Sequence, residues 1–363
     1  MITGRYIPWQ RKSPQKFVAL MLAGMAMSWA ITACSSNNTS PSATNSGSSA
    51  KSPVTLTLVS YAVTQKAYEQ IIPKFVQQWQ DKTGQTVTFN QSYAGSGSQA
   101  RAVIDGLEAD VVALALALDT KKIEKAGLIE PGWEKELPNE SIVHKSVAAL
   151  VTRDANVKVS KWSDLAQDGL KVITANPKTS GGARWNYLVL WGSVTQAGGT
   201  DQQAEAFVEK VYKNVPVLPK DAREASDVFY KQSQGDVLIN YENEVLLAKQ
   251  QGDKQPFIVP TDYNISIDNP VAIVDANVDK HGTREVSEAF VKFLFTPEAQ
   301  REFAKIGFRP VDEKVAQEFA SQYPKVNKLF TAKDLGGWGE IQTKFFDDGA
   351  VFDKMQSKIS KSK

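Results

Sequence analysis

The most constraining feature of the sequence is a strand-like run that turns through two glycines into a helix. Residues Leu170 to Thr174 favour a strand and lead into the segment Asn176-Pro-Lys-Thr-Ser-Gly-Gly182. From Ala183 the pattern predicts a helix that continues through Trp191. Such a turn presents backbone N–H groups and a hydroxyl at the positive end of a helix dipole, where an anion can bind. An ordinary capped helix start has the same signature, so this turn alone leaves both interpretations open.

Three further turns of this kind lie between a predicted strand and a predicted helix. They are Ser60-Tyr-Ala-Val-Thr64, Gly95-Ser-Gly-Ser98 and Lys220-Asp-Ala222. Each of them, taken alone, is also explained as a helix cap. If several helix N-termini converge on one cleft, however, they form an anion pocket that needs no Lys or Arg beside the ligand.

Strand and helix patterns alternate along the rest of the chain. The predicted strands cover residues 55–61, 86–93, 110–118, 146–152, 236–240 and 270–275. The run from 110 to 118 is apolar after its first residue, as expected of a strand that is covered on both faces. This alternation predicts an α/β fold with parallel sheets, and 363 residues are enough for two domains with separate cores.

The charge distribution gives little support to a nucleic-acid partner. The chain has 42 basic and 40 acidic residues, and the first 33 residues contain four of the bases and no acid. The remainder therefore carries 38 bases and 40 acids, without a basic block. We expect no nucleic-acid binding from such a chain.

The N-terminus is predicted to be a targeting segment, with residues 1–33 as a lipoprotein signal peptide. A basic region precedes the apolar run Phe17 to Ala33, and small residues before a cleavage point are typical of secretory signals. The segment Ile31-Thr-Ala-Cys34 resembles the bacterial lipoprotein box, which implies cleavage before Cys34 and lipidation of its thiol. Cys34 is the one cysteine of the chain, so no disulfide can use it. The alternatives are secretion without lipid and a short membrane anchor, for which the run is at the low end of length.

Residues 34–53 are expected to form a flexible tether. They consist almost entirely of Ser, Asn, Thr, Gly, Ala and Pro, a composition that cannot bury a core. A tether behind a lipidated cysteine would let a globular head reach away from the membrane.

Enzyme signatures are weak in this sequence. Gly95-x-Gly97-x-x-Ala100 matches a loose dinucleotide fingerprint, and Asp119 follows about 24 residues later, close to the spacing of the acidic partner. A nucleotide-dependent enzyme therefore stays a remote alternative. His144 and His281 are the two histidines, and we expect both on the solvated surface; no Gly-x-Ser-x-Gly elbow and no zinc spacing is present. We expect no catalytic residue, no metal and no cofactor.

Four segments resemble the periplasmic sulfate-binding protein family, in register from about Val54 to Trp338. The segments are Tyr93-Ala-Gly-Ser-Gly-Ser-Gln-Ala100, Glu108-Ala-Asp-Val-Val-Ala-Leu-Ala-Leu-Ala117, Asn176-Pro-Lys-Thr-Ser-Gly-Gly-Ala-Arg-Trp-Asn-Tyr187 and Tyr241-Glu-Asn-Glu244. The third of them is highly specific. The resemblance implies a two-lobed α/β receptor of the type II periplasmic-binding-protein fold, which closes over sulfate and delivers it to an ABC-type importer.

The same resemblance implies the residues of the site. It places sulfate-binding groups at Ala62, Ser96, Ser180, Gly181, Gly182, Ala222 and Tyr241. Arg184 and Arg223 fall on arginines that lie near the pocket in the family and support it from behind.

Three departures from the family pattern bear on ligand selectivity. Ala62-Val63 replaces Asp-Pro in the first turn, and Asp221 stands where glycine is common. Tyr241 replaces a tryptophan that donates its indole N–H, and the tyrosine hydroxyl can donate instead. Thiosulfate-binding relatives share much of the pattern, so thiosulfate or another tetrahedral oxyanion is the alternative ligand.

These inferences combine into one predicted organisation. Lobe 1 is expected to comprise residues 54–137 and about 245–310, lobe 2 residues 138–244, and the C-terminal helices, 311–363, are expected to pack across both. The predicted protein is a monomer in the periplasm, anchored to the outer face of the inner membrane through lipidated Cys34. Its expected partners are sulfate and the membrane subunits and ATPase of the importer.

Overall fold

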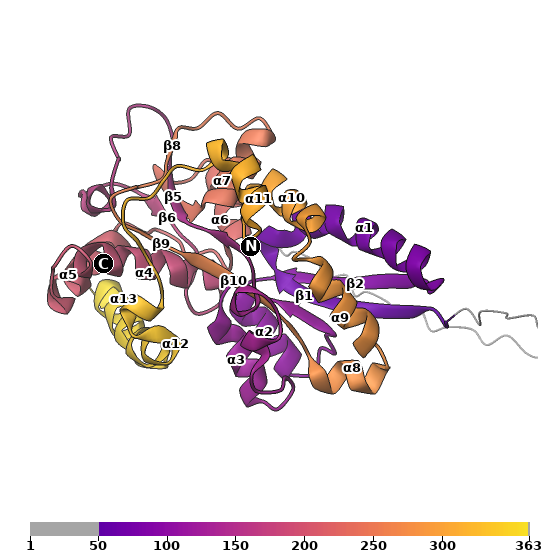
Figure 1. The fold of residues 1–363 in the computed structure, drawn as a ribbon. Helices are drawn as coiled ribbons and strands as arrows, with labels where there is room; N and C mark the ends of the chain where they lie inside the picture. Colours follow the sequence, from indigo (N-terminus) through magenta and orange to yellow (C-terminus); the bar gives the residue numbers. More distant parts are fainter. Residues whose placement is uncertain (1–50, 362–363) are drawn as a thin grey trace, which may run out of the picture. The chain divides into compact units, whose positions relative to one another are not determined.

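The computed structural model describes residues 51–361, which form two α/β lobes, each built on its own sheet (Figure 1). The predicted signal peptide, Cys34 and nearly all of the predicted tether lie outside the described residues. Between residues 51 and 361, no helix combines the length and the apolar character that crossing a membrane requires.

Lobe 1 contains a six-stranded mixed sheet in the order β11-β4-β10-β3-β1-β2. Its strands are β1 (Val54–Tyr61), β2 (Val87–Ala94), β3 (Val111–Ala113), β4 (Ile142–Ser146), β10 (Ile267–Ile273) and β11 (Arg309–Pro310). The first three strands are parallel, as the strand–helix alternation predicts. β10 runs antiparallel to both β3 and β4, so the sheet is mixed rather than wholly parallel.

Helices cover both faces of the lobe 1 sheet. They are α1 (Gln65–Thr83), α2 (Ser96–Ile104), α3 (Ala117–Lys125), α8 (Asp275–His281), α9 (Arg284–Phe293), α10 (Pro297–Lys305) and α11 (Glu313–Glu318). Because side chains alternate along a strand, Leu58 packs on one face with α1, α9 and α10, whereas Val59 packs on the other with α2 and α3. The predicted start of α10 is confirmed, since Thr296 Oγ1 accepts a hydrogen bond from the Ala299 N–H.

Lobe 2 contains a four-stranded sheet in the order β6-β7-β5-β8. Its strands are β5 (Ala148–Thr152), β6 (Val172–Ile173), β7 (Val237–Tyr241) and β8 (Phe257–Ile258). Its helices are α4 (Gly181–Thr195), α5 (Asp201–Lys213), α6 (Ala222–Tyr230) and α7 (Glu242–Gln250). α4 is buried along most of its length, and it packs against α5, β7 and β5.

The chain crosses between the lobes at different residues from those expected. The first crossing is at Val147 rather than near 138, because β4 pairs with β10 in the lobe 1 sheet. The return falls between β8 and β10 rather than near 244, because β8 pairs with β5 in lobe 2. The two crossing segments lie side by side: the buried side chain of Asn264 hydrogen-bonds both the N–H and the C=O of Ala148.

The C-terminal region divides between the lobes instead of packing across them as one unit. α11 contacts α10 in lobe 1, and β12 (Leu329–Phe330) pairs with β9 (Asn264–Ile265). Beyond them, α12 (Gly337–Ile341), the π-helix Gln342–Phe346 and α13 (Val351–Lys361) cover α4 and α5 through aromatic contacts such as Trp338 with Trp185. α12 also touches α3, so this end of the chain reaches lobe 1 at one point.

Candidate anion-binding site

A small cavity of about 180 Å³ lies where the turns of both lobes meet. All seven residues predicted to bind the anion line it. The complete lining is Tyr61, Ala62, Val63, Ala94, Gly95, Ser96 and Ala115 from lobe 1, and Ser180, Gly181, Gly182, Asp221, Ala222 and Tyr241 from lobe 2. The fold therefore brings together four turns that are far apart in the sequence.

Helix N-termini point at this cavity from several directions. α2 begins at Ser96, α4 at Gly181 and α6 at Ala222, and a 3-10 helix that leads into α1 begins at Ala62. N–H groups in the first turn of a helix have no partner within the helix. The N–H groups of Ser96, Gly181 and Ala222 have no acceptor among residues 51–361. They are available to an anion, and the helix dipoles favour one there.

The glycines of these turns allow the two lobes to touch. A Cβ on Gly181 would lie 2.5 Å from the Leu116 side chain and 2.6 Å from the Ala115 Cβ. A Cβ on Gly95 would lie 2.6 Å from the Thr179 carbonyl oxygen. Both contacts cross the boundary between the lobes, so glycine is required for this close approach, and the cleft is closed in this structure.

Two tyrosine hydroxyls are buried at the cavity without a hydrogen-bond partner in the described structure. They belong to Tyr61 and Tyr241, whose rings are 6.0 Å apart. The Tyr241 Oη lies 3.0 Å from the Cβ position of Gly182, so this hydroxyl faces the start of α4. Burial, followed by the charges of Glu244 and Asp119, raises the pKa of Tyr241 well above its ordinary value, so the phenol stays protonated. Burying an unpaired donor costs about 1–3 kcal/mol, which an anionic ligand would offset.

The two serines of the site differ in what they offer. Ser180 Oγ caps α4 by accepting from the Ala183 N–H at 3.2 Å, and its proton remains free to donate into the cavity. Ser96 Oγ donates to Asp119 Oδ2 at 2.8 Å and accepts from the Ala115 N–H at 3.0 Å. Its hydroxyl is therefore fully used, and the backbone N–H is the group that Ser96 presents to a ligand.

A buried ion pair joins the lobes directly behind the cavity. Arg184 Nη1 on α4 donates to Asp119 Oδ1 on α3 at 2.7 Å, and both side chains are almost fully buried. Burial alone would raise the pKa of Asp119, but Arg184, Lys122 and the Ser96 hydroxyl outweigh it and hold the pKa below its usual range. Arg184 Nε also donates to the Pro177 carbonyl, which fixes the turn before α4.

Arg223 supports the site from within lobe 2. Its guanidinium makes two hydrogen bonds to the buried carboxylate of Glu244, at 2.7 and 3.0 Å. Burial raises the pKa of Glu244, although Arg223 opposes this shift. Neither Arg184 nor Arg223 lines the cavity.

Asp221 lines the cavity, yet its carboxylate is engaged at the start of α6. Oδ1 accepts a hydrogen bond from the Glu224 N–H at 2.9 Å, and Glu224 in turn accepts from the Lys220 N–H at 2.7 Å. This capping arrangement turns the carboxylate toward its own helix. The Glu224 N–H therefore partly compensates the negative charge that Asp221 introduces where glycine is common in the family.

The enzyme alternatives find little support in the geometry. Asp119, the candidate acidic residue of a dinucleotide site, is bound to Arg184 and Ser96 instead of facing a ligand. The cavity is also smaller than the 300 Å³ or more that is typical of cofactor sites. Within residues 51–361, no group of three or more metal-ligating side chains is present.

The expectation of a solvated surface position is wrong for His144 and confirmed for His281. His144 on β4 is fully buried against Phe303 and Phe308, and burial lowers its pKa to about 3. His281 is partly exposed and lies between Glu108 and Asp110, at 2.9 Å from each. Neither histidine lines the cavity.

Sequence reasoning missed three contributors to the site. Tyr61 and Ala115 line the cavity, and Asp119 organises it from behind. β3 ends at Ala113 rather than continuing to 118, because Ala115 is drawn into other contacts: its carbonyl accepts from the Trp185 indole of lobe 2 and from Asn269. The only available signal for Asp119 was its position after an apolar strand, which also fits a ribose-binding acid.

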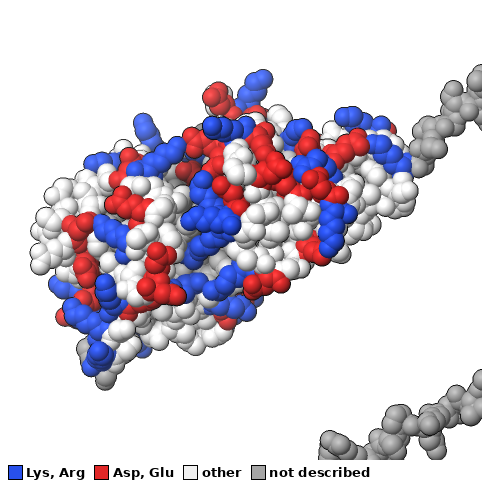
Figure 2. Space-filling model, turned by 90° about the horizontal axis from the view of Figure 1, so that it is seen from below, with Lys and Arg blue, Asp and Glu red and all other residues white. Residues whose placement is uncertain are grey.

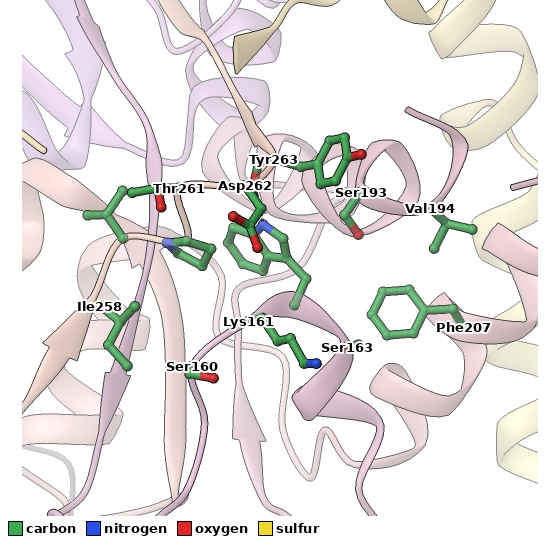
Figure 3. A pocket seen from close by; sticks show the side chains of 13 residues that line it. Ser160, Lys161, Ser163, Ser193, Val194, Phe207, Ile258, Thr261, Asp262 and Tyr263 are labelled. Carbon is green, nitrogen blue, oxygen red and sulfur yellow. Dashed lines mark hydrogen bonds between the residues drawn. The ribbon is translucent and has the colours of Figure 1, made fainter. Parts of the chain in front are cut away.

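A wider pocket, of about 830 Å³, lies elsewhere in lobe 2 and shares no residue with the cavity (Figure 3). It opens between the segment 160–163, α4, α5 and the segment 258–263. Its charged side chains, Lys161 and Asp262, are exposed. It lacks the convergent, buried donors that mark the smaller cavity as the anion-site candidate.

Comparison with known proteins gives the same picture as the site geometry. Residues 56–309 match the family model described as bacterial extracellular solute-binding protein. A sulfate-binding protein of Synechocystis is 61% identical over 95% of this chain and 96% of its own length. A thiosulfate-binding protein of Pseudomonas aeruginosa is 37% identical over 86% of this chain and 95% of its own. Among solved structures, the sulfate-binding protein SubI of Mycobacterium tuberculosis is 35% identical with a TM-score of 0.74, covering 81% of this chain and all of that one.

Proposed function

The chain belongs to the bacterial extracellular solute-binding protein family, and we propose that it captures sulfate and passes it to an ABC-type importer. The buried, unpartnered hydroxyl of Tyr241 at the start of α4 carries this proposal. Together with the free N–H groups of three helix starts, it forms a set of donors that lacks an acceptor. A small, fully ionised oxyanion has the complementary chemistry.

The donor set favours a dianion that carries no proton. Backbone N–H groups donate and cannot accept, so a protonated oxygen of the ligand could find an acceptor only at a hydroxyl or at the Asp221 carboxylate, which is turned to the Glu224 N–H. Sulfate has no proton near neutral pH, whereas inorganic phosphate keeps at least one, because it has one more ionisable proton than a phosphate ester, whose second and last proton leaves at a pKa of about 6. Leaving that proton unpaired in a closed site costs about 1–3 kcal/mol.

Thiosulfate is the alternative ligand within the same proposal. Its terminal sulfur is a weak acceptor in comparison with oxygen, so it would make poorer use of the donors. The sulfate-binding relative is also more similar to this chain than the thiosulfate-binding one, at 61% against 37% identity. We therefore propose sulfate as the preferred ligand.

A calorimetric titration of the protein with sulfate, thiosulfate, molybdate, phosphate and NAD tests the function. The proposal predicts one tight site for sulfate, weaker binding of thiosulfate and phosphate, and no binding of NAD. Tight NAD binding, or no heat with any oxyanion, would refute it. If thiosulfate binds more tightly than sulfate, the proposed receptor function stands and thiosulfate is its preferred ligand.

The finer points of location follow from the N-terminal sequence. We propose that Cys34 is lipidated after cleavage of residues 1–33 and that the head, a monomer, works from the outer face of the inner membrane. The lipoprotein-like segment before the single cysteine supports this proposal. Mass spectrometry of the mature native protein tests it, and an unmodified Cys34 thiol would rule it out.

A further inference from the structure

A second pocket, rich in basic side chains, opens beside the Asp119–Arg184 ion pair. Four of its lining residues are basic: Arg101 on α2, Lys122 on α3, Lys178 before α4, and Arg184 on α4. The two pockets have no lining residue in common. Figure 2 looks onto the face that carries α2, α3 and α12, and Lys and Arg side chains gather near its middle.

The negative groups at this pocket are mostly committed to other partners. Lys178 is paired with Asp353 at 2.9 Å and with Asp348 at 3.3 Å, so two carboxylates face this lysine and it adds no net positive charge to the pocket. Asp347, which also lines the pocket, accepts from the Gln342 amide at 2.6 Å. An exposed carboxylate with a neutral partner offers only weak, screened compensation to the cations.

Two of the three other cations, Arg184 and Lys122, share one buried carboxylate. Arg184 is 2.7 Å from Asp119, and Lys122 is 3.4 Å from the same oxygen. The Arg101 side chain forms no ion pair or hydrogen bond with any residue between 51 and 361. Burial lowers the pKa of Lys122, and the nearby charge of Arg184 lowers it further, as expected beside a like charge.

We propose that this pocket binds a second small oxyanion, of the inorganic sulfate class, which bridges α2 and α3 of lobe 1 to α4 of lobe 2. Guanidinium groups present N–H donors in a fork that matches an oxyanion, and Arg101 supplies such a fork from lobe 1. Arg184 of lobe 2 adds its Nη2, because its Nε and Nη1 already donate to Pro177 and Asp119. The site is more open than the cavity and includes an exposed arginine, so its affinity is lower and depends on salt.

Equilibrium dialysis with radiolabelled sulfate at fixed ionic strength tests this site on the whole protein. The expected result is two sulfates per chain, in a tight phase and a separate weaker phase. Arg101→Gln should weaken the second phase about tenfold, because one charge-assisted hydrogen bond is lost. Arg101 has no partner in the fold, so the variant should remain folded, as circular dichroism will check.

Lys125→Gln is the matched control, since Lys125 ends α3, is exposed and does not line the pocket. It should leave the weak phase within twofold of the wild type. Sulfate concentrations up to about 10 mM would fill a site with a Kd near 1 mM. If only one sulfate binds per chain over this range, that result would overturn the proposal. So would a weak phase that Arg101→Gln leaves unchanged, or one that Lys125→Gln weakens equally. The tight phase reports on the receptor function separately, so the two proposals can fail independently.

Discussion

At the scale of single residues, the Tyr241 hydroxyl is the most informative atom of the site. Tyr241→Phe keeps the buried ring and removes a donor that has no partner in the described structure. Sulfate affinity should fall by roughly 1–3 kcal/mol, the range for a hydrogen bond to a charged group. The stability of the ligand-free protein should be unchanged or slightly higher, because an unpaired polar group is removed. Calorimetry and denaturant unfolding measure the two effects, and unchanged affinity would reduce the phenol to a packing role.

Ser180 is expected to act twice, as the cap of α4 and as a donor to the anion. Ser180→Ala should lower stability by about 1 kcal/mol and sulfate affinity by roughly 1–3 kcal/mol. Thr200→Ala is the matched control, because Thr200 caps α5 in the same way and does not line the cavity. Thr200→Ala should lower stability and leave sulfate affinity unchanged. Equal losses of affinity in both variants would show that capping, rather than donation, explains the effect.

At the scale of elements, the start of α4 controls how closely the lobes approach. Gly181→Ala would place a Cβ within 2.6 Å of Ala115 and closer still to Leu116, so the cleft could not close as observed. Sulfate binding should weaken by at least tenfold in calorimetry, since closure completes the donor set. Gly339→Ala is the control, because a Cβ there meets nothing within 4 Å. A Gly181→Ala protein that binds like the wild type would show that ligand binding does not need this contact.

His144 on β4 should make stability depend on pH. Its pKa is lowered to about 3 in the fold, so below about pH 6.5 the unfolded chain binds a proton that the folded chain does not. The free energy of unfolding should therefore fall as the pH falls from about 6.5 toward 4, by up to about 1.4 kcal/mol per unit from this group. His144→Leu should remove this part of the slope in urea unfolding at several pH values.

His281 provides the contrast to His144. Hydrogen bonds that His281 donates to the carboxylates of Glu108 and Asp110 raise the pKa of His281, so its stabilising contribution is present below about pH 6.5 and is lost as the pH rises through the folded pKa. His281→Gln should therefore lower stability mainly below about pH 6.5, where the contribution of His281 is present, and it should leave the acid slope of His144 in place. An acid slope that is as steep in His144→Leu as in the wild type would contradict the assignment.

At the scale of the whole molecule, neighbouring residues in the sequence predicted the turns, but they did not predict the long-range contacts around those turns. The glycine turns at 95–98 and 180–182 and the Thr296 cap could be predicted because they depend on neighbouring residues. The partners of β4, the early end of β3 and the burial of His144 depend on residues more than 100 positions away. The ion pair of Asp119 with Arg184 likewise joins two lobes that no local pattern relates. Such pairings are set by tertiary packing, which periodicity does not encode.

The central claim is that the two lobes close around a site that offers donors to a proton-free dianion. The described residues that line the cavity include no histidine, and the tyrosines there stay protonated. Glu244, whose pKa is raised by burial, lies behind the cavity. Its protonation sets the lower end of the pH range over which sulfate affinity should be constant. Sulfate affinity should therefore be nearly constant from about pH 6 to 8.

The most direct test is calorimetric titration of sulfate and phosphate at several pH values in this range, with the wild type and Asp221→Gly. The account predicts constant sulfate affinity and phosphate binding that is weaker by about 1–3 kcal/mol, because a phosphate proton finds no acceptor. Asp221→Gly should leave this order in place, since the Asp221 carboxylate is turned to the Glu224 N–H. Phosphate binding as tight as sulfate in the wild type, and lost in Asp221→Gly, would contradict the account and make Asp221 the residue that selects the ligand.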